Sequence, residues 1–171
     1  MPQKKPFLHL QGRVDPKMRS EMERRIEQLS INGSPHFELF ISSDGGDFHD
    51  GMRIAEMIQD YAGCVTGTVV RYAASAAVSI LLMCDVRRAT RSSILLAHNV
   101  RVEIPSEIFR NKHKLAQTVQ DALAAADFVE DMYADKLKMS KRRVRAFLRE
   151  DRTLTAKEAL ELGIIHEILK R

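Results

Sequence analysis

The chain has 171 residues, of which 44% are hydrophobic and 29% are charged, and its formal net charge is +4. These values are typical of a globular protein that buries a core, and we expect a single domain over residues 1–171. No apolar run is long enough for a membrane span or a signal peptide, so we expect no membrane partner. The two cysteines, Cys64 and Cys84, lack metal-ligand or disulfide spacing, which favours a reducing cytoplasm.

The first half of the chain alternates between predicted strands and helices. The first strand ends at Gly12, and Asp15 caps the helix that follows, with Pro16 at its first position. In chain order, the pattern predicts a strand at residues 6–12, a helix at 15–30, a turn at 31–34, a strand at 36–42, a helix at 48–62, a strand at 64–72 and a buried helix at 75–84.

The second half begins with the apolar segment SSILLAH and continues with a long helical pattern. Ser140 and Thr155 are the predicted N-caps of two short helices. In chain order, the pattern predicts a strand at residues 92–98, a helix from about 106 to 138, helices at 140–151 and 155–163, and a strand at 164–169. The apolar positions of the long helix step by three and four residues, at Leu115, Val119, Ala122, Ala126, Val129 and Tyr133. Alternating strands and helices predict an α/β fold.

Three stretches at the ends of predicted strands carry groups suited to catalysis. The segment SDGGD has two glycines, which allow a tight turn and bring backbone amides close to a ligand. Ser75 stands between alanines where a strand meets a helix, as in a nucleophile elbow, although the GxSxG pattern is absent. His98 ends the strand at residues 92–98. A hydroxyl, an imidazole and backbone amides are the groups that acyl transfer requires.

Each of these stretches also has a purely structural interpretation. The glycine pair is consistent with a plain turn, Ser75 with the N-cap of a buried helix, and His98 with a structural histidine. Acyl transfer by a triad also needs a carboxylate that orients the histidine. Asp151 is the first candidate, and spacing alone leaves Glu150 and Asp127 open.

Four segments together resemble the proteolytic subunit of the Clp protease (ClpP), a serine peptidase with the crotonase-type fold. They read FELFISSDGGDFHDGMRIAEMI, AASAAVSILL, LLAHN and EDRTLTAKEALELGIIHEIL, and they keep the family's order and spacing from about Phe7 to Leu169. The resemblance implies repeated strand-strand-helix units and a handle helix, which falls on residues 106–138. It also implies a ring-shaped homo-oligomer, a heptamer or a double heptamer, that cleaves peptides or unfolded proteins.

The resemblance also implies roles for individual residues. The family's nucleophile falls on Ser75, its general base on His98 and its acid on Asp151. Its oxyanion hole, which is made of two backbone amides, falls on Gly46 and Ala76. This chemistry needs neither a metal nor an organic cofactor, so we expect none.

The chain departs from the family's pattern at several places. Asp44 replaces a proline, and Arg71 replaces a glycine, so that Arg71 is expected either to fill a substrate pocket or to pair with Asp44. After His98, NVRVEIPSE replaces a Gln-Pro and glycine-rich segment that binds substrate and joins the two rings in the family. Because the family's axial loop has no counterpart in MPQKK, we expect weak coupling to a Clp-type ATPase through such a loop.

A serine endopeptidase is the principal functional hypothesis. One alternative is a crotonase-like acyl-CoA enzyme that uses the amides of Gly46 and Ala76 on an enolate. The other is a catalytically silent ring subunit, suggested by Arg71 and by the changed segment after His98. The basic run KLKMSKRRVR lacks interleaved aromatic residues, so we expect a solvated helix face there and no nucleic acid partner.

Overall fold

The computed structural model describes residues 5–170, in two compact units. The first unit contains the chain up to Ala97 and the residues from Arg152 onward, and the second contains residues 98–151. Apart from Lys5, the MPQKK segment lies outside the described residues.

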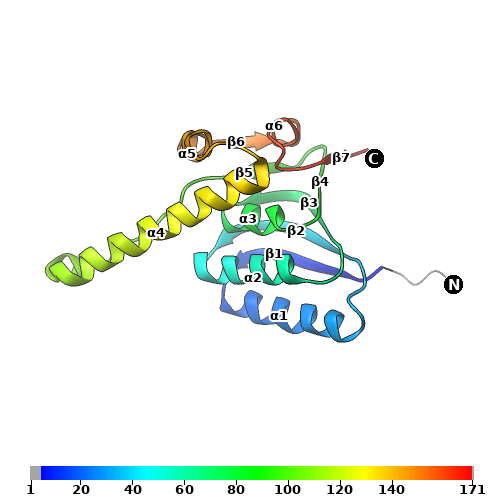
Figure 1. The fold of residues 1–171 in the computed structure, drawn as a ribbon, viewed down its shortest axis with the longest axis horizontal. Coiled ribbons are helices and arrows are strands. Elements are labelled where there is room, and N and C mark those ends of the chain that lie inside the picture. Colours follow the sequence, from blue (N-terminus) through cyan, green and yellow to red (C-terminus); the bar gives the residue numbers. More distant parts are fainter. Residues whose placement is uncertain (1–4, 171) are drawn as a thin grey trace. The chain divides into compact units, whose positions relative to one another are not determined.

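A seven-stranded sheet forms the centre of the first unit (Figure 1). Five of its strands pair in parallel in the order β1-β2-β3-β4-β7, while β5 pairs in parallel with β3 and antiparallel with β6. The strands are β1 (Phe7–Val14), β2 (Phe37–Gly46), β3 (Val65–Ala74), β4 (Val86–Thr90), β5 (Ile94–Leu96), β6 (Thr153–Thr155) and β7 (Glu167–Leu169). The predicted α/β class is confirmed.

Three helices of the first unit follow the first three strands in turn. They are α1 (Pro16–Ile31), α2 (Phe48–Asp60) and α3 (Ala76–Leu82), and a fourth helix, α6 (Ala156–Glu161), follows β6. Figure 1 shows α1, α2 and α3 in chain order along the sheet, where α1 contacts α2 and α2 contacts α3. Every residue of α3 is buried, so the core of the unit surrounds this short helix.

Side-chain caps begin α1 and α6 where the sequence predicts them. The Asp15 carboxylate accepts a hydrogen bond from the Met18 amide at 2.8 Å, and Pro16 is the first residue of α1. Thr155 and Glu158 form a reciprocal capping box at the start of α6. Such bonds satisfy amides that have no partner within the first turn of a helix.

Several predicted strand bounds in the first unit are wrong. The strand β2 continues past residue 42, through the predicted turn, to Gly46, and β7 begins at Glu167 and not at residue 164. Gly12 does not end β1, because it lies at a bulge with φ of 87°, where the register against β2 shifts, and the strand continues to Val14. The predicted strand at residues 92–98 is shorter, since β5 ends at Leu96 and His98 follows in a loop. The strands β4 and β6 are not predicted.

The second unit consists of two α-helices and a preceding 3₁₀ turn. The predicted helix from about 106 to 138 is divided into a 3₁₀ helix, η1 (Ser106–Arg110), and α4 (Lys112–Leu137). Asn111 causes this division, because its side chain accepts a hydrogen bond from the Lys114 amide at 3.0 Å and caps α4. The helix α5 (Lys141–Glu150) packs against α4, where Arg145 donates to both carboxylate oxygens of the buried Glu130.

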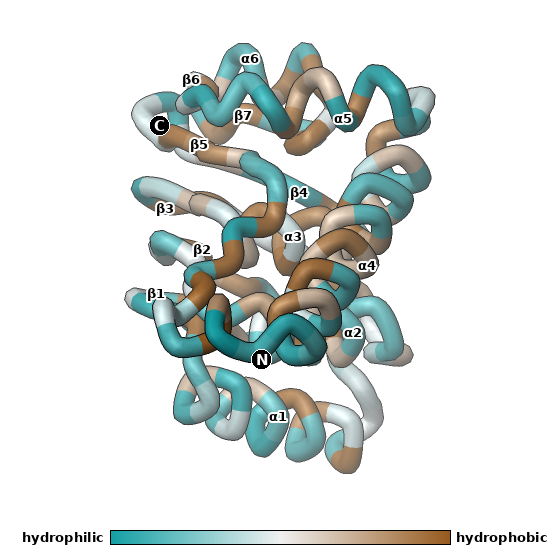
Figure 2. Tube along the Cα trace, turned by 90° about the vertical axis from the view of Figure 1, so that its left-hand side faces the viewer, coloured by the Kyte–Doolittle hydropathy of each residue, from teal (hydrophilic) through white to brown (hydrophobic). Residues whose placement is uncertain are grey.

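The two halves of α4 differ in exposure. Val129, Met132 and Tyr133 are buried in its C-terminal half, whereas Val119 and Leu123 are 42% and 63% exposed in its N-terminal half. Hydrophobic and hydrophilic segments alternate along the helix in Figure 2. Among the helices of residues 5–170, none is long and apolar enough to cross a membrane.

Candidate active site

Ser75 forms a sharp turn between β3 and α3. Its backbone has φ of 55° and ψ of −125°, a conformation that non-glycine residues seldom adopt, and its amide donates to the Leu96 carbonyl at 2.8 Å. The Ser75 side chain makes no capping hydrogen bond to α3 within the described chain, so the N-cap interpretation does not explain this serine. A strained strand-to-helix turn of this kind is the geometry of a nucleophile elbow.

The elbow at Ser75 packs so closely against two glycines that neither could carry a side chain. A Cβ atom added to Gly45 would lie 2.9 Å from both the Ala76 amide nitrogen and the Ser75 Cβ. A Cβ added to Gly51 in α2 would lie 2.7 Å from the Ala76 Cβ. The backbone of the Gly-Gly loop therefore lies directly against the elbow, as amides that serve one reacting centre must.

The two glycines of this loop have different hydrogen-bonding roles. The Gly45 amide donates to the Ser43 hydroxyl at 3.1 Å, and that hydroxyl donates to the Gly12 carbonyl at 2.6 Å. Gly46 lies opposite Val14 in the sheet, and a Cβ added to it would collide with the Val14 carbonyl oxygen. Since the Gly45 amide is engaged inside the loop, Gly46 remains the candidate oxyanion donor beside Ala76.

The second unit contains the other two triad candidates, His98 and Asp151, and each has a different partner there. The Nδ1 atom of His98 lies 2.6 Å from the Asn99 carbonyl oxygen, which only accepts hydrogen bonds and therefore favours a proton on Nδ1. Asp151 has φ of 50° at the end of α5, and its carboxylate forms an ion pair with Arg101. Within the described part of this unit, the structure gives no hydrogen bond between His98 and Asp151.

The competing acid Asp127 belongs to a surface ion-pair network between α4 and α5. Its carboxylate lies 3.5 Å from the Lys141 ammonium and 3.6 Å from the Arg145 guanidinium. These contacts connect the two helices, which favours a structural role for Asp127. Asp151 and Glu150 remain adjacent candidates at the end of α5.

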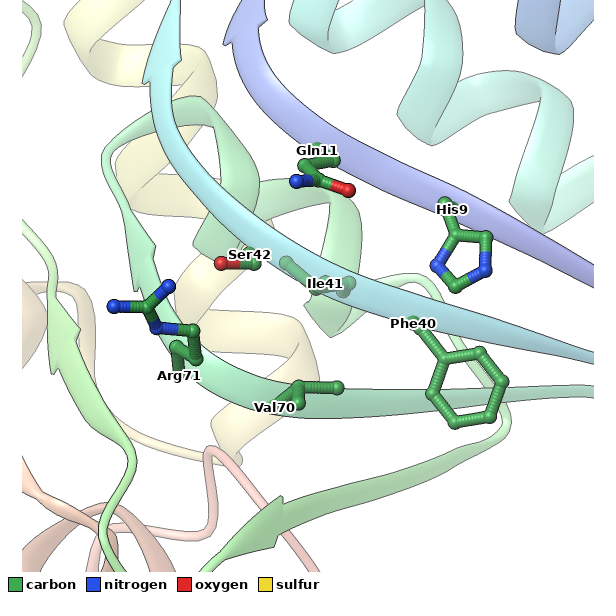
Figure 3. A pocket seen from close by; sticks show the side chains of 7 residues that line it. All are labelled: His9, Gln11, Phe40, Ile41, Ser42, Val70 and Arg71. Carbon is green, nitrogen blue, oxygen red and sulfur yellow. The ribbon is translucent and has the colours of Figure 1, made fainter.

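The expected pair between Arg71 and Asp44 is not formed. Asp44 instead accepts a hydrogen bond from the Tyr72 hydroxyl at 3.5 Å. Arg71 contributes to a surface cavity of about 380 Å³ in the first unit (Figure 3). The sequence does not predict this cavity, because its wall is assembled from three strands. The lining residues are His9, Gln11, Phe40, Ile41, Ser42, Val70 and Arg71.

These features define an α/β protein in which a strained serine turn at the end of a parallel strand meets a glycine loop. The model of the Clp protease family matches residues 3–171, so the chain belongs to the Clp protease family, a family of peptidases. Its fold is similar to that of a ClpP1 mutant from Listeria monocytogenes, with a TM-score of 0.85 and 18% sequence identity over 96% of this chain and 91% of that chain. The family and the fold implied by the sequence motifs are confirmed.

Proposed function

We propose that this protein is a serine endopeptidase that cleaves peptides or unfolded proteins, with Ser75 as its nucleophile. The observation that carries this proposal is the strained backbone of Ser75, packed against the Gly-Gly loop, in a member of a peptidase family. A serine held in such a turn has its hydroxyl exposed at the end of a strand, with the following amide directed at the same reacting atom.

The proposed first step is the attack of the Ser75 hydroxyl on a peptide carbonyl. A bond forms between the serine oxygen and the carbonyl carbon, while the hydroxyl proton passes to His98 Nε2. The amides of Gly46 and Ala76 would donate to the resulting oxyanion, and each such donor contributes about 3 kcal/mol in other acyl-transfer enzymes. The C–N bond then breaks, His98 gives its proton to the leaving amine, and water hydrolyses the acyl-enzyme.

The roles of His98 and Asp151 rest on the family's motifs and on chain connectivity. In the first unit, Leu96 of β5 is the pairing partner of Thr153 of β6, and the Leu96 carbonyl also binds the Ser75 amide. His98 is the second residue after Leu96, and Asp151 is the second residue before Thr153. Asp151 would replace the Asn99 carbonyl as the acceptor of the Nδ1 proton of His98, hold this tautomer and stabilise the imidazolium.

We also propose that the protein acts as a ring-shaped homo-oligomer. The exposed Val119 and Leu123 give the N-terminal half of α4 an apolar surface that a second copy of the chain would cover. A heptamer or a double heptamer is the proposed form by analogy with the family. Weak coupling to a Clp-type ATPase and a cytoplasmic location belong to the same proposal.

A catalytically silent ring subunit is the second candidate. It is favoured by the ion pair between Asp151 and Arg101, which occupies the carboxylate that a triad would need. The match to a peptidase family favours both candidates over a crotonase-like acyl-CoA enzyme.

Hydrolysis of fluorogenic peptides by the purified oligomer distinguishes the candidates. The endopeptidase proposal predicts turnover by the unmodified protein and its loss in Ser75→Ala, which fits among the neighbouring alanines without disturbing the fold. Equal activity of the two proteins would contradict the role of Ser75. Absence of turnover in a correctly assembled oligomer would favour the silent subunit.

A further inference from the structure

The Gly-Gly loop at the end of β2 has a backbone that its own residues cannot hold in place. Gly45 and Gly46 have φ of 78° and 156°, values that other residues seldom adopt. Gly45 is buried, whereas Gly46 is exposed and presents its backbone to a ligand. Because glycine has no side chain that restricts its backbone, the direction of the Gly46 amide has to be fixed by neighbouring residues.

The side chain of Ser43 makes two hydrogen bonds that hold the first end of this loop. Its hydroxyl is fully buried, donates to the Gly12 carbonyl at 2.6 Å and accepts from the Gly45 amide at 3.1 Å. The register between β1 and β2 shifts at this point, and the pairing skips Gly12 on β1 together with Ser43 and Asp44 on β2. Ser43 therefore connects the two strands where their regular pairing is interrupted.

A second set of contacts holds the other end of the loop. Gly46 pairs with Val14 of β1, and the Asp47 amide donates to the Val14 carbonyl at 2.9 Å. The peptide group between the two glycines is planar, so the direction of its N–H is set by the way in which both ends are held. Gly45 also lies against the elbow, because an added Cβ would lie 2.5 Å from the Ala74 carbonyl oxygen.

We propose that Ser43 is a positioning residue that directs the Gly46 amide toward the oxyanion formed in the reaction. This inference rests on the proposed peptidase function of Ser75. The Ser43 hydroxyl is fully buried, so it acts on the reaction through the backbone of Gly45 and not by contact with the substrate. An oxyanion donor is effective only when its N–H is already aimed at the developing charge, so a small rotation of this peptide group weakens the stabilisation of the transition state.

Peptide hydrolysis by Ser43→Ala separates positioning from substrate binding. Removal of one oxyanion donor lowers kcat by about 10²–10³-fold in other acyl-transfer enzymes, and a displaced donor should cost less. We expect kcat to fall by about 10- to 100-fold and KM to change by less than about twofold, because the lost interaction forms only in the transition state. Ser43→Cys, which keeps a weaker donor, should have an intermediate kcat. An unchanged kcat, or a rise in KM alone, would overturn the inference.

Ser93→Ala is the matched control for the loss of a buried hydroxyl. The Ser93 hydroxyl lies 2.7 Å from the Thr90 hydroxyl and donates to the Val69 carbonyl at 2.9 Å. Both alanine variants should lower the Tm by about 2–5 °C, because each leaves a buried backbone group without its partner, but only Ser43→Ala should lose turnover. An equal loss of kcat in the two variants would show that Ser43 has a merely structural role and would overturn the inference.

Hydrogen exchange followed by mass spectrometry tests the inference independently of catalysis. In Ser43→Ala the Gly45 amide loses its acceptor, so the fragment that contains Gly45 and Gly46 should exchange about three- to tenfold faster, while a fragment that contains β4 should be unchanged. Unchanged exchange at the loop, or faster exchange throughout the first unit, would overturn the inference even if no peptide is hydrolysed. Absence of turnover in the unmodified protein would contradict the peptidase function, and the exchange measurement would still decide whether Ser43 holds the loop.

Discussion

The backbone of Ser75 has a conformation that the surrounding residues must maintain. A non-glycine residue with positive φ costs about 1–3 kcal/mol, and such residues are concentrated at functional sites. The hydrogen bond from the Ser75 amide to the Leu96 carbonyl and the complete burial of α3 hold this residue in place. The surrounding residues of the first unit therefore maintain the strained turn.

Asp151 is the residue whose assignment is most readily tested by conservative substitution. Asp151→Asn should lower turnover by up to about 10⁴-fold, because an amide favours the wrong tautomer of the catalytic histidine. Glu150→Gln and Asp127→Asn are the matched controls and should retain most of the activity. If Asp151→Asn is fully active and one of the controls is inactive, the acid is wrongly assigned.

The ion pair between Arg101 and Asp151 leads to a prediction about the turnover of Arg101 variants. Arg101 competes with His98 for the same carboxylate, and exposed ion pairs of this kind contribute about 0.2–1 kcal/mol. Arg101→Gln should therefore raise the turnover of a neutral peptide by up to about fivefold, while Arg101→Lys should change it less. A loss of activity in Arg101→Gln would show that Arg101 supports catalysis instead.

The capping box of α6 should make the stability of the protein depend on pH through Glu158. The Thr155 amide and hydroxyl, each 2.8 Å from the Glu158 carboxylate, lower the pKa of Glu158 to about 2, with a further contribution from Arg152. Because the folded-state pKa is lower than the unfolded value of about 4.3, the stabilisation is complete above pH 4.3 and is lost as the pH falls through about 2.

Glu158→Gln should therefore lower the Tm at neutral pH by about 2–4 °C, and this difference should shrink as the pH falls toward 2. Glu161→Gln, on the same helix but outside the capping box, is the control and should have a smaller effect at every pH. Thermal denaturation followed by circular dichroism measures both. A Tm difference for Glu158→Gln that is unchanged between pH 7 and pH 2 would contradict this assignment.

Elements with strong local signals are predicted well, and elements formed by tertiary contacts are not. The caps Asp15 and Thr155 act within one helical turn, so the sequence places α1 and α6 correctly. The strand β4 reads VRRAT, which carries no clear apolar pattern. It forms because it pairs with β3 and β7 and because the buried Arg87 donates to the carbonyls of Ile164 and Gly163.

In the candidate site, too, local patterns predict some features, whereas features formed by tertiary contacts are missed. The elbow at Ser75 is predicted because it lies at the end of a recognisable strand, whereas Gly45 and Gly46, expected in a turn, are the last two residues of β2. The pairing of Arg101 with Asp151 joins residues that are fifty positions apart, and no local pattern indicates it. The cavity around Arg71 also escapes prediction, because its lining comes from three strands.

At the scale of the whole molecule, the apolar surface of α4 predicts association between copies of the chain. Val119→Lys should dissociate the oligomer or separate its rings, because a charge would replace an apolar side chain in the proposed interface. Gln117→Lys is the matched control, since residues 117 and 119 project from nearly opposite sides of a helix. Light scattering measures the mass, and a fully active monomer of the unmodified protein would contradict the assembly.

Labelling with a fluorophosphonate tests the central claim most directly, because such probes react with activated serine nucleophiles. The assembled protein should be modified at Ser75 with one probe per chain, as located by peptide mass spectrometry. Ser75→Ala should remain unlabelled, and His98→Ala should react much more slowly, because the base that activates the hydroxyl is removed. A folded, assembled protein that is not labelled at Ser75, or that is labelled equally fast without His98, would contradict the proposed serine peptidase.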